Sequence, residues 1–222
     1  MQASPRHRSR WMLSLAAVAA TAASLVALPG RAAVPATASL AAARADTAGF
    51  AGGCFWSMEH VFDHMPGVIS ATSGFSGGTA RNPSYDQVSN GGTGHAETVQ
   101  VVFDPTKTSY ARLLDAYWHN IDPVSPNGQF CDHGTQYRTV IFAHGADQLR
   151  QAQASKTALE RSGRFKSRIN TQVVAAGPFY AAEEYHQHYT EKNPVHYALY
   201  RRACGRDQRL RELWGDSAGG QH

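Results

Sequence analysis

A cysteine that follows two glycines is the residue in this sequence best placed for chemistry. Cys54 comes directly after Gly52 and Gly53, which allow the tight turn that joins a strand to a helix. Apolar residues then recur at helical spacing until Pro66-Gly67 ends the run, at Phe55, Met58, Val61, Phe62 and Met65. Cys54 is therefore predicted in the first turn of a helix, where the dipole and the free N–H groups favour an anion. We expect its thiolate, the nucleophilic form, to form more easily than that of a free cysteine.

A carboxyl group on an alternating strand is the second reactive group. Residues 96–103 alternate between two faces, so Glu97 shares a face with Val99, Val101 and Phe103. If that face is buried, desolvation raises the pKa of the carboxyl group and creates a proton donor near neutral pH. A position in water at the end of the strand is the open alternative, and the strand pattern alone does not decide between the two.

Several segments in the same order resemble the A-type peptide methionine sulfoxide reductases. The segments are GCFW at residues 53–56, GHAE at 94–97, DHGTQYR at 132–138 and EEYHQHY at 183–189. They are similar to the family's GCFWG signature, its GHAE segment, its D-x-G-x-Q-Y-R segment and a block around Y-H-Q. Ser57 departs from the pattern, because many members have glycine there. The resemblance covers most of the chain from about Phe50 to Gly215, including a similar tail.

The resemblance implies a reaction and a role for each site residue. The reaction is reduction of methionine-S-sulfoxide, free or in damaged proteins, to methionine. Cys54 attacks the sulfoxide sulfur, and Glu97 acts as the acid. The expected substrate-binding residues are Phe55 and Trp56, which receive the methyl group, Tyr85 and Tyr137, which donate hydrogen bonds to the oxygen, and Asp132, which orients the site. The resemblance implies that no metal and no organic cofactor take part.

The three cysteines of the chain are an odd number, so at least one thiol is free or pairs transiently. The resemblance implies that Cys204 is the resolving cysteine, which condenses with the Cys54 sulfenic acid to a disulfide. A structural disulfide from Cys204 to Cys131 or Cys54 stays open. Cys131, directly before Asp132, is predicted to be a packed and inert thiol. Recycling is then expected to pass from the Cys54–Cys204 disulfide to an outside thioredoxin or thioredoxin-like reductant.

The histidines suggest a metal hypothesis that their spacing does not support. His186 and His188 lie beside acidic residues, but no cluster with zinc spacing accompanies them. We therefore predict structural packing for this segment. His60 and His64 are predicted, with Ser57, on the solvent-facing side of the Cys54 helix.

The order of predicted elements indicates an α+β fold. Strands are expected at 68–75, 96–103, 137–143 and 171–175, and helices follow Cys54, a Thr108 cap and Asp147. Long loops cover 76–94, where an Asn82-Pro83-Ser84 turn caps a short helix carrying Tyr85, and 121–136. The C-terminal part from Gly177 is predicted to be irregular, with short helices near 182–189 and 207–214. This layout predicts a mixed sheet with helices packed on it and a ferredoxin-like centre.

The first residues are predicted to be an export signal. Arg6, Arg8 and Arg10 precede an apolar run from Trp11 to Leu28. We predict an export signal at 1–31, a linker at 32–46, one catalytic domain at 47–215 and a flexible tail at 216–222. The protein is then periplasmic or secreted, and an uncleaved membrane anchor is the lesser alternative.

The charge balance argues against a nucleic-acid partner. The formal net charge is +4, and residues 1–31 hold four arginines and no acid, so the remainder is neutral. Nothing in the sequence requires more than a monomer.

Two other classes of protein remain to be tested. A cysteine hydrolase or acyl transferase needs an imidazole base beside Cys54, for which His95 and His186 are candidates. A non-catalytic exported binding module would hold Cys54 in a permanent disulfide.

Overall fold

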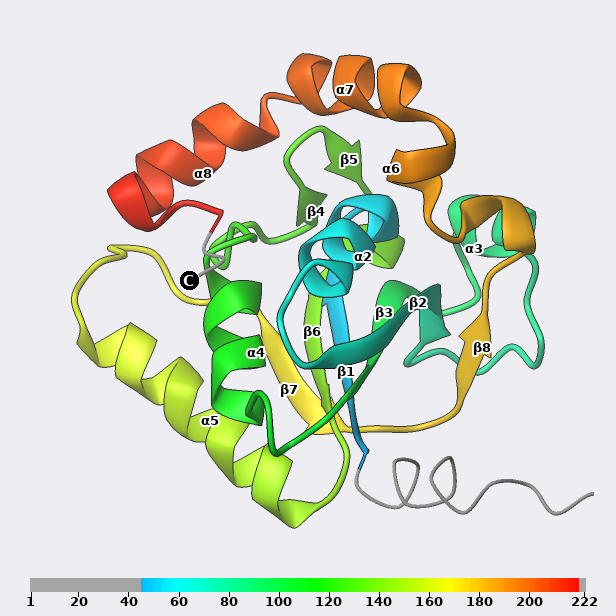
Figure 1. Ribbon diagram of the computed structural model, residues 1–222. Coiled ribbons are helices and arrows are strands. Elements are labelled where there is room, and N and C mark those ends of the chain that lie inside the picture. Colours follow the sequence, from blue (N-terminus) through cyan, green and yellow to red (C-terminus); the bar gives the residue numbers. More distant parts are fainter. Residues whose placement is uncertain (1–44, 220–222) are drawn as a thin grey trace, which may run out of the picture. The chain divides into compact units, whose positions relative to one another are not determined.

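The computed structural model describes residues 45–219, which fall within one compact unit (Figure 1). The predicted export signal and nearly all of the predicted linker lie outside the described residues, as do residues 220–222 of the predicted tail. The domain begins with a strand at Asp46 and runs to Gly219, whose N–H donates to the His119 carbonyl at 3.0 Å. Between residues 45 and 219, no helix combines the length and the apolar character needed to span a membrane.

A six-stranded mixed sheet forms the centre of the domain, in the order β7-β6-β1-β3-β2-β8. Its strands are β1 (Asp46–Gly52), β2 (Val68–Ser76), β3 (Ala96–Phe103), β6 (Thr139–Ala143), β7 (Gln172–Ala175) and β8 (Phe179–Ala181). All neighbouring strands are antiparallel except β6 and β7. A separate small hairpin is formed by β4 (Gly128–Gln129) and β5 (Asp132–His133).

Seven α-helices and three single-turn 3₁₀ helices are present among the described residues. The α-helices are α2 (Phe55–Asp63), α3 (Tyr85–Ser89), α4 (Tyr110–Trp118), α5 (Ala146–Arg161), α6 (Tyr189–Lys192), α7 (Pro194–Ala203) and α8 (Arg206–Trp214). The 3₁₀ helices are η1 (Thr135–Tyr137), η2 (Glu184–His186) and η3 (Gly215–Ser217). Helices α6, α7 and α8 follow one another around the domain on the side where α2 begins (Figure 1).

The chain order β1-α2-β2-β3-α4-β6 confirms the predicted α+β fold with a ferredoxin-like centre. These strands pair as β6-β1-β3-β2, so β3 lies between the two strands that α2 connects. Strands β7 and β8 extend the sheet at its two edges. The core lies between the sheet and the first two long helices, where the Phe50 ring stacks on Phe62 at 4.9 Å and on Tyr117 at 5.2 Å. This core fixes the start of α2, and with it Cys54, against the sheet.

Several predicted boundaries shift because local hydrogen bonds differ from the pattern. Helix α4 is capped by Ser109, whose Oγ accepts from the Arg112 N–H at 3.3 Å, so the predicted Thr108 cap is wrong by one residue. The strand predicted from 137 starts at Thr139, because η1 occupies the preceding residues. The short helix carrying Tyr85 is confirmed: Ser84 Oγ accepts from the Gln87 N–H, and the Gln87 side chain accepts from the Ser84 N–H.

Helix α7 and strand β8 lie in the part of the chain predicted to be irregular. Helix α7 buries only Tyr197, while Val195 and Leu199 are exposed, so the helix lacks the apolar stripe by which a pattern is recognised. Its position also corrects the prediction that Ser57 faces solvent, whereas His64 is exposed as predicted. Ser57 and Glu59 are buried because the chain from η2 to α7 covers them.

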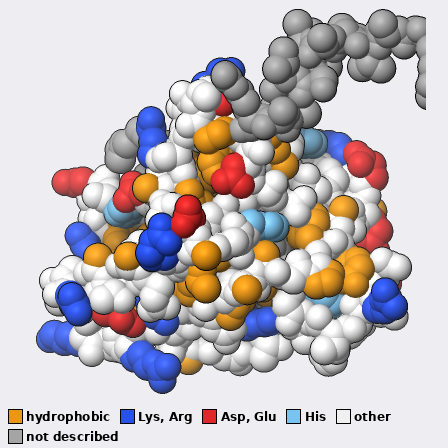
Figure 2. Space-filling view, turned by 90° about the horizontal axis from the view of Figure 1, so that it is seen from below, with side chains coloured by type: hydrophobic (Ala, Val, Ile, Leu, Met, Phe, Trp, Pro, Cys, Tyr) orange, Lys and Arg blue, Asp and Glu red, His pale blue; other side chains and the backbone are white. Residues whose placement is uncertain are grey.

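The face of the domain that Figure 2 shows carries Lys and Arg side chains interspersed with Asp and Glu. Apolar side chains lie singly and in small groups between them. This face therefore carries charges of both signs.

Candidate active site

Cys54 lies at the junction of β1 and α2, one residue earlier than predicted. It is the N-cap of α2 rather than a first-turn residue. Gly53, immediately before it, has φ +81°, and a Cβ there would lie 2.5 Å from the Gln129 Cβ. Only glycine fits this turn, for both conformational and steric reasons. The turn places the Cys54 side chain at the end of the sheet with 6% of its surface exposed.

Glu97 lies on a buried face of β3. Of the two positions that the sequence left open, burial with the apolar residues is the one that the structure shows. Glu97 is 3% exposed, and the three apolar residues that share its face, Val99, Val101 and Phe103, are buried. Its Oε2 accepts a hydrogen bond from the Phe55 N–H at 2.9 Å, which holds the carboxyl group against the start of α2. Burial raises the pKa of Glu97 to about 8, an effect that the Phe55 hydrogen bond opposes and the Asp132 charge reinforces. Glu97 is therefore a carboxylic acid at neutral pH.

A single small cavity brings together all the predicted nucleophile, acid and substrate-binding residues. Its volume is about 100 Å³, and it is lined by Cys54, Phe55, Trp56, Tyr85, Glu97, Asp132, Tyr137 and Tyr200. The residues come from α2, α3, β3, β5, η1 and α7, so they are distant in sequence. Seven of the eight were predicted, and Tyr200 was not. The predicted resolving residue, Cys204, is not among the lining residues.

Phenol groups at the cavity are held in their protonated form. Burial raises the pKa of Tyr85 to about 12, with further contributions from the Glu97 and Cys54 charges. Burial also raises the pKa of Tyr137, again reinforced by the Glu97 charge. Both hydroxyl groups therefore remain hydrogen-bond donors over the whole physiological pH range. Donors that line a small cavity can stabilise an oxygen atom that gains negative charge.

An aromatic wall closes one side of the cavity. The Trp56 ring stacks on Tyr189 at 3.7 Å, and its Nε1–H donates to His186 Nδ1 at 3.1 Å. The buried Phe55 ring packs 5.1 Å from the same imidazole and 5.8 Å from Phe75. His186 therefore has a packing role, in agreement with the prediction for its segment. The wall offers a surface suited to a methyl group.

The ionisation of Cys54 corrects the sequence prediction of an easily formed thiolate. Burial raises the pKa of Cys54 to about 12, and the Glu97 and Asp132 charges add to this. A hydrogen bond with the Tyr200 side chain and the charge of Arg206 act in the opposite direction. The helix terminus alone suggested a lowered pKa, but loss of water around the sulfur outweighs it. The resting residue is a thiol.

A disulfide joins Cys131 to Cys204, with 4.9 Å between their Cα atoms. This pairing was one of those left open from sequence. The prediction that Cys131 is packed and inert is wrong, because its side chain is exposed and bonded to another sulfur. Cys54 is the free cysteine. The structure therefore shows Cys204 with Cys131 as its partner in place of Cys54.

Two residues that the sequence did not predict belong to the surroundings of Cys54: Tyr200 lines the cavity, and the charge of Arg206 acts on the thiol. Tyr200 projects from α7, and its hydroxyl donates to Asp132 Oδ2. Arg206 begins α8 and is 2% exposed; one nitrogen donates to the Asn120 carbonyl at 2.8 Å, while Nε and Nη1 have no hydrogen-bond partner. The sequence around Tyr200 and Arg206 gives no local sign that these two side chains are partly or fully buried. Only the docking of the C-terminal segment reveals them.

Two groups of potential metal ligands occur among residues 45–219. They are Glu59, Asp63 and His188, and Cys131, Asp132 and Cys204. In the second group the two sulfurs are bonded to each other. In the first, the His188 imidazole already pairs with Asp63 at 2.8 Å, and none of the three residues lines the cavity.

The cavity does not contain the base that a cysteine hydrolase requires. In the described part of the chain no histidine lines it. His95 uses both ring nitrogens elsewhere, with Gly78 N–H at 3.2 Å and the Ala80 carbonyl at 2.8 Å. The free state of Cys54 is also contrary to a binding module that holds this residue in a permanent disulfide.

A buried thiol, a neutral carboxylic acid and a separate exposed disulfide define a thiol-dependent oxidoreductase. Residues 46–218 match the family described as peptide methionine sulfoxide reductase. The chain belongs to this family, as the sequence motifs implied, and its reaction is reduction of methionine sulfoxide by a thiol.

Named relatives support the same assignment over nearly their whole length. The chain is 48% identical over 174 residues to peptide methionine sulfoxide reductase MsrA of Bacillus licheniformis, covering 78% of this chain and 96% of that protein. It is 52% identical over 169 residues to the MsrA of Ligilactobacillus salivarius, covering 76% and 98%.

Solved structures are similar as well. Methionine sulfoxide reductase A of Corynebacterium diphtheriae has a TM-score of 0.62 at 34% identity, over 68% of this chain and 76% of that one. The reduced form of Mxr1 from Saccharomyces cerevisiae has a TM-score of 0.63 at 32% identity, over 69% and 88%.

Proposed function

We propose that this protein reduces the S epimer of methionine sulfoxide, free or within oxidised proteins, with Cys54 as nucleophile and Glu97 as acid. The observation that supports this best is the placement of a thiol and a neutral carboxylic acid on the same cavity of about 100 Å³. A sulfoxide carries a methyl group, an electrophilic sulfur and a basic oxygen. The aromatic wall, the thiol and the acid with its neighbouring phenols match these three features.

The first chemical step converts the thiol to a sulfenic acid. The methyl group packs against Phe55 and Trp56, and the oxygen accepts hydrogen bonds from Tyr85, Tyr137 and Glu97. Glu97 transfers its proton to the oxygen while the Cys54 sulfur attacks the sulfoxide sulfur, and the thiol proton restores the acid. Cys54 then carries the oxygen as a sulfenic acid, and methionine leaves. One thiol and one sulfoxide give one sulfenic acid and one thioether, so atoms and electrons balance.

The second step removes the oxygen as water. The thiol of Cys204 condenses with the Cys54 sulfenic acid to form a disulfide. Because Cys204 does not line the cavity, this step requires the junction of α7 and α8 to approach Cys54. A thioredoxin or thioredoxin-like dithiol then restores the thiols by exchange.

Export is part of the proposal and is supported by the charge and apolar layout of residues 1–31. The protein would work in the periplasm or outside the cell, as a monomer and without a nucleic-acid partner, and the reductant would be a dithiol protein of that compartment. Mass spectrometry of the N-terminus of the exported protein tests this. An intact Met1 on the mature protein would contradict a cleaved signal.

Reduction of a methionine sulfoxide peptide without added reductant tests the activity directly. Reduced wild-type protein is expected to release at least one equivalent of methionine per enzyme, and the Cys54→Ser variant none. The matched control is Cys131→Ser, which removes a different thiol and keeps the nucleophile. Methionine release that persists in the Cys54→Ser variant would exclude Cys54 as the nucleophile.

A further inference from the structure

The Cys131–Cys204 disulfide lies near the active-site cavity, because the Cys131 sulfur is 3.8 Å from Oδ1 of Asp132, which lines the cavity. Cys131 is exposed between β4 and β5, and Cys204 follows the last residue of α7. Each cysteine is close in sequence to a residue that lines the cavity, Asp132 in one case and Tyr200 in the other. Either sulfur is thus held near the cavity while the bond itself faces the surface.

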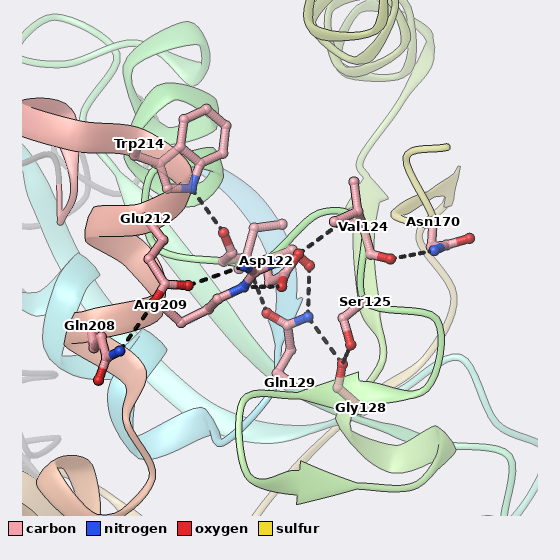
Figure 3. Close-up of polar contacts among 11 residues, drawn as sticks. Asp122, Val124, Ser125, Gly128, Gln129, Asn170, Gln208, Arg209, Glu212 and Trp214 are labelled. Atoms are coloured by element: carbon pink, nitrogen blue, oxygen red, sulfur yellow. Dashed lines mark hydrogen bonds and ion pairs between the residues drawn. The ribbon is translucent and has the colours of Figure 1, made fainter. Parts of the chain in front are cut away.

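The tail that carries Cys204 is held in place by contacts other than the disulfide. Figure 3 shows the network that joins α8 to the loop preceding the β4–β5 hairpin. Arg209 Nε donates to Asp122 Oδ2 at 2.8 Å, and Trp214 Nε1 donates to the Ile121 carbonyl at 3.0 Å. The Gln129 side chain accepts from the Asp122 N–H and donates to its carbonyl, both at 2.8 Å.

These contacts hold the segments on both sides of the disulfide together without it, at positions outside the α7–α8 junction that carries Cys204. Gln129 belongs to β4, just before Cys131, and Arg209 belongs to α8, just after Cys204. Helix α7 is tied down separately, because the Tyr197 hydroxyl donates to Ser57 Oγ at 2.9 Å. The tail therefore does not need the disulfide in order to dock, so the bond is available for redox chemistry. The junction of α7 and α8, which carries Cys204 and has to approach Cys54, lies between the Tyr197 and Arg209 contacts.

We propose that Cys131 is a second resolving cysteine, which takes over Cys204 from the nucleophile and presents the resulting disulfide to the external reductant. The proposal rests on the reductase function proposed above. A disulfide that includes Cys54 would be enclosed, since that residue is 6% exposed. A protein reductant has to reach the sulfur that it attacks, and Cys131 is the exposed member of the three cysteines.

The exchange is balanced without an added oxidant. The Cys131 thiolate attacks the Cys204 sulfur of the Cys54–Cys204 disulfide, so that the Cys131–Cys204 bond forms and the Cys54–Cys204 bond breaks. Cys54 leaves with the electron pair and takes up the proton that Cys131 lost. The nucleophile is regenerated as a thiol while the enzyme remains oxidised at the surface.

Asp132 and Tyr200 connect the two sulfurs that exchange this proton. The Cys131 sulfur lies 3.8 Å from Asp132 Oδ1, and Asp132 Oδ2 accepts from the Tyr200 hydroxyl. Tyr200 and Cys54 both line the cavity. A proton that Cys131 loses to Asp132 can reach Cys54 through the Tyr200 hydroxyl, which takes up the Asp132 proton as it gives its own to Cys54.

Counting methionine per enzyme tests the proposal. The protein is reduced, freed of reductant and given excess methionine sulfoxide peptide; the products are then alkylated and mapped by mass spectrometry without reduction. Wild type is expected to release about two methionines, because a regenerated Cys54 reacts a second time. The Cys131→Ser variant is expected to release about one and to stop at the Cys54–Cys204 disulfide.

The Cys204→Ser variant is the matched control, because it lacks the same disulfide bond and the same structural constraint. It is expected to release about one methionine and to retain a Cys54 sulfenic acid that reacts with dimedone. Equal yields and equal products from the two variants, or a wild type that stops at one methionine, would overturn the relay. A Cys54–Cys131 disulfide in Cys204→Ser would overturn the order of attack. Failure of the reductase itself is distinguishable, because wild type then releases no methionine at all.

Discussion

Two sulfur sites in this protein differ in almost every physical property. Cys54 is buried at the junction of β1 and α2, next to a neutral carboxylic acid, and its thiol has a raised pKa. Cys131 and Cys204 form a disulfide at the surface, outside the cavity. Reaction with a sulfoxide needs a small cavity with positioned donors, whereas electron delivery by another protein needs an accessible sulfur. The buried sulfur suits the first of these needs and the surface disulfide the second, as the relay proposed above requires.

The largest expected effect comes from removing the acid beside the buried sulfur. Glu97→Gln is predicted to lower kcat/KM for a methionine sulfoxide peptide at neutral pH by roughly 10²- to 10⁴-fold. The deficit shrinks at low pH if solvent acid replaces the lost donor. In wild type the rate should decline as pH rises through about 8, where Glu97 loses its proton, and the variant should lack that decline.

Glu59→Gln is the control for that measurement. Burial raises the pKa of Glu59 to about 7, but the side chain does not line the cavity. A pH–rate profile that changes equally in both variants would remove the special role of Glu97.

The buried acid should also make stability depend on pH. Because the pKa of Glu97 is raised from 4.5 to about 8 in the folded state, the folded protein binds this proton more tightly than the unfolded chain. Its contribution to the free energy of unfolding is greatest below pH 4.5 and is lost as pH rises towards 8, by on the order of a few kcal/mol. Urea unfolding at several pH values should show a smaller loss for Glu97→Gln than for wild type.

A smaller effect is expected from the buried arginine that favours the Cys54 thiolate. Arg206→Met removes this charge while keeping an apolar side chain beside Phe130, whose ring the guanidinium faces at 4.4 Å. The pKa of Cys54 should rise, and its alkylation rate at fixed pH should fall by about tenfold. Arg209→Met, on the same helix, is the control because Arg209 pairs with Asp122 instead. Equal alkylation rates in the two variants would show that Arg206 does not act on the sulfur.

The smallest effect is expected from the hydrogen bond between Tyr197 of α7 and Ser57 of α2. Tyr197→Phe and Ser57→Ala each remove the hydrogen bond that ties α7 to α2, and each should lower the free energy of unfolding by about 1 kcal/mol. The double variant should cost less than the sum of the two, because they share one contact. Additive effects in urea unfolding would mean that the hydroxyl groups act separately. Ser57 accepts this bond through its hydroxyl group, which the glycine common at this position in the family lacks.

Prediction from sequence succeeded where the signal is local. The two-glycine turn before Cys54, the alternation that buries Glu97 and the cap that begins the helix of Tyr85 each depend on a few neighbouring residues. The motif resemblance added Tyr137 and Asp132, and all of these line one cavity. Helix α7 was missed because its exposed Val195 and Leu199 leave no periodic apolar face, and Tyr200 was missed with it.

The sequence by itself determined the residue types, the fold class and the place of the nucleophile at the end of a strand. Only the tertiary structure decided the ionisation of Cys54, because desolvation by the packed chain outweighs the local effect of the helix terminus. It also decided which sulfur Cys204 meets, because β4, β5 and the C-terminal helices come together through contacts between residues far apart in the chain. Such long-range contacts leave no local pattern, and they place the second sulfur site at the surface.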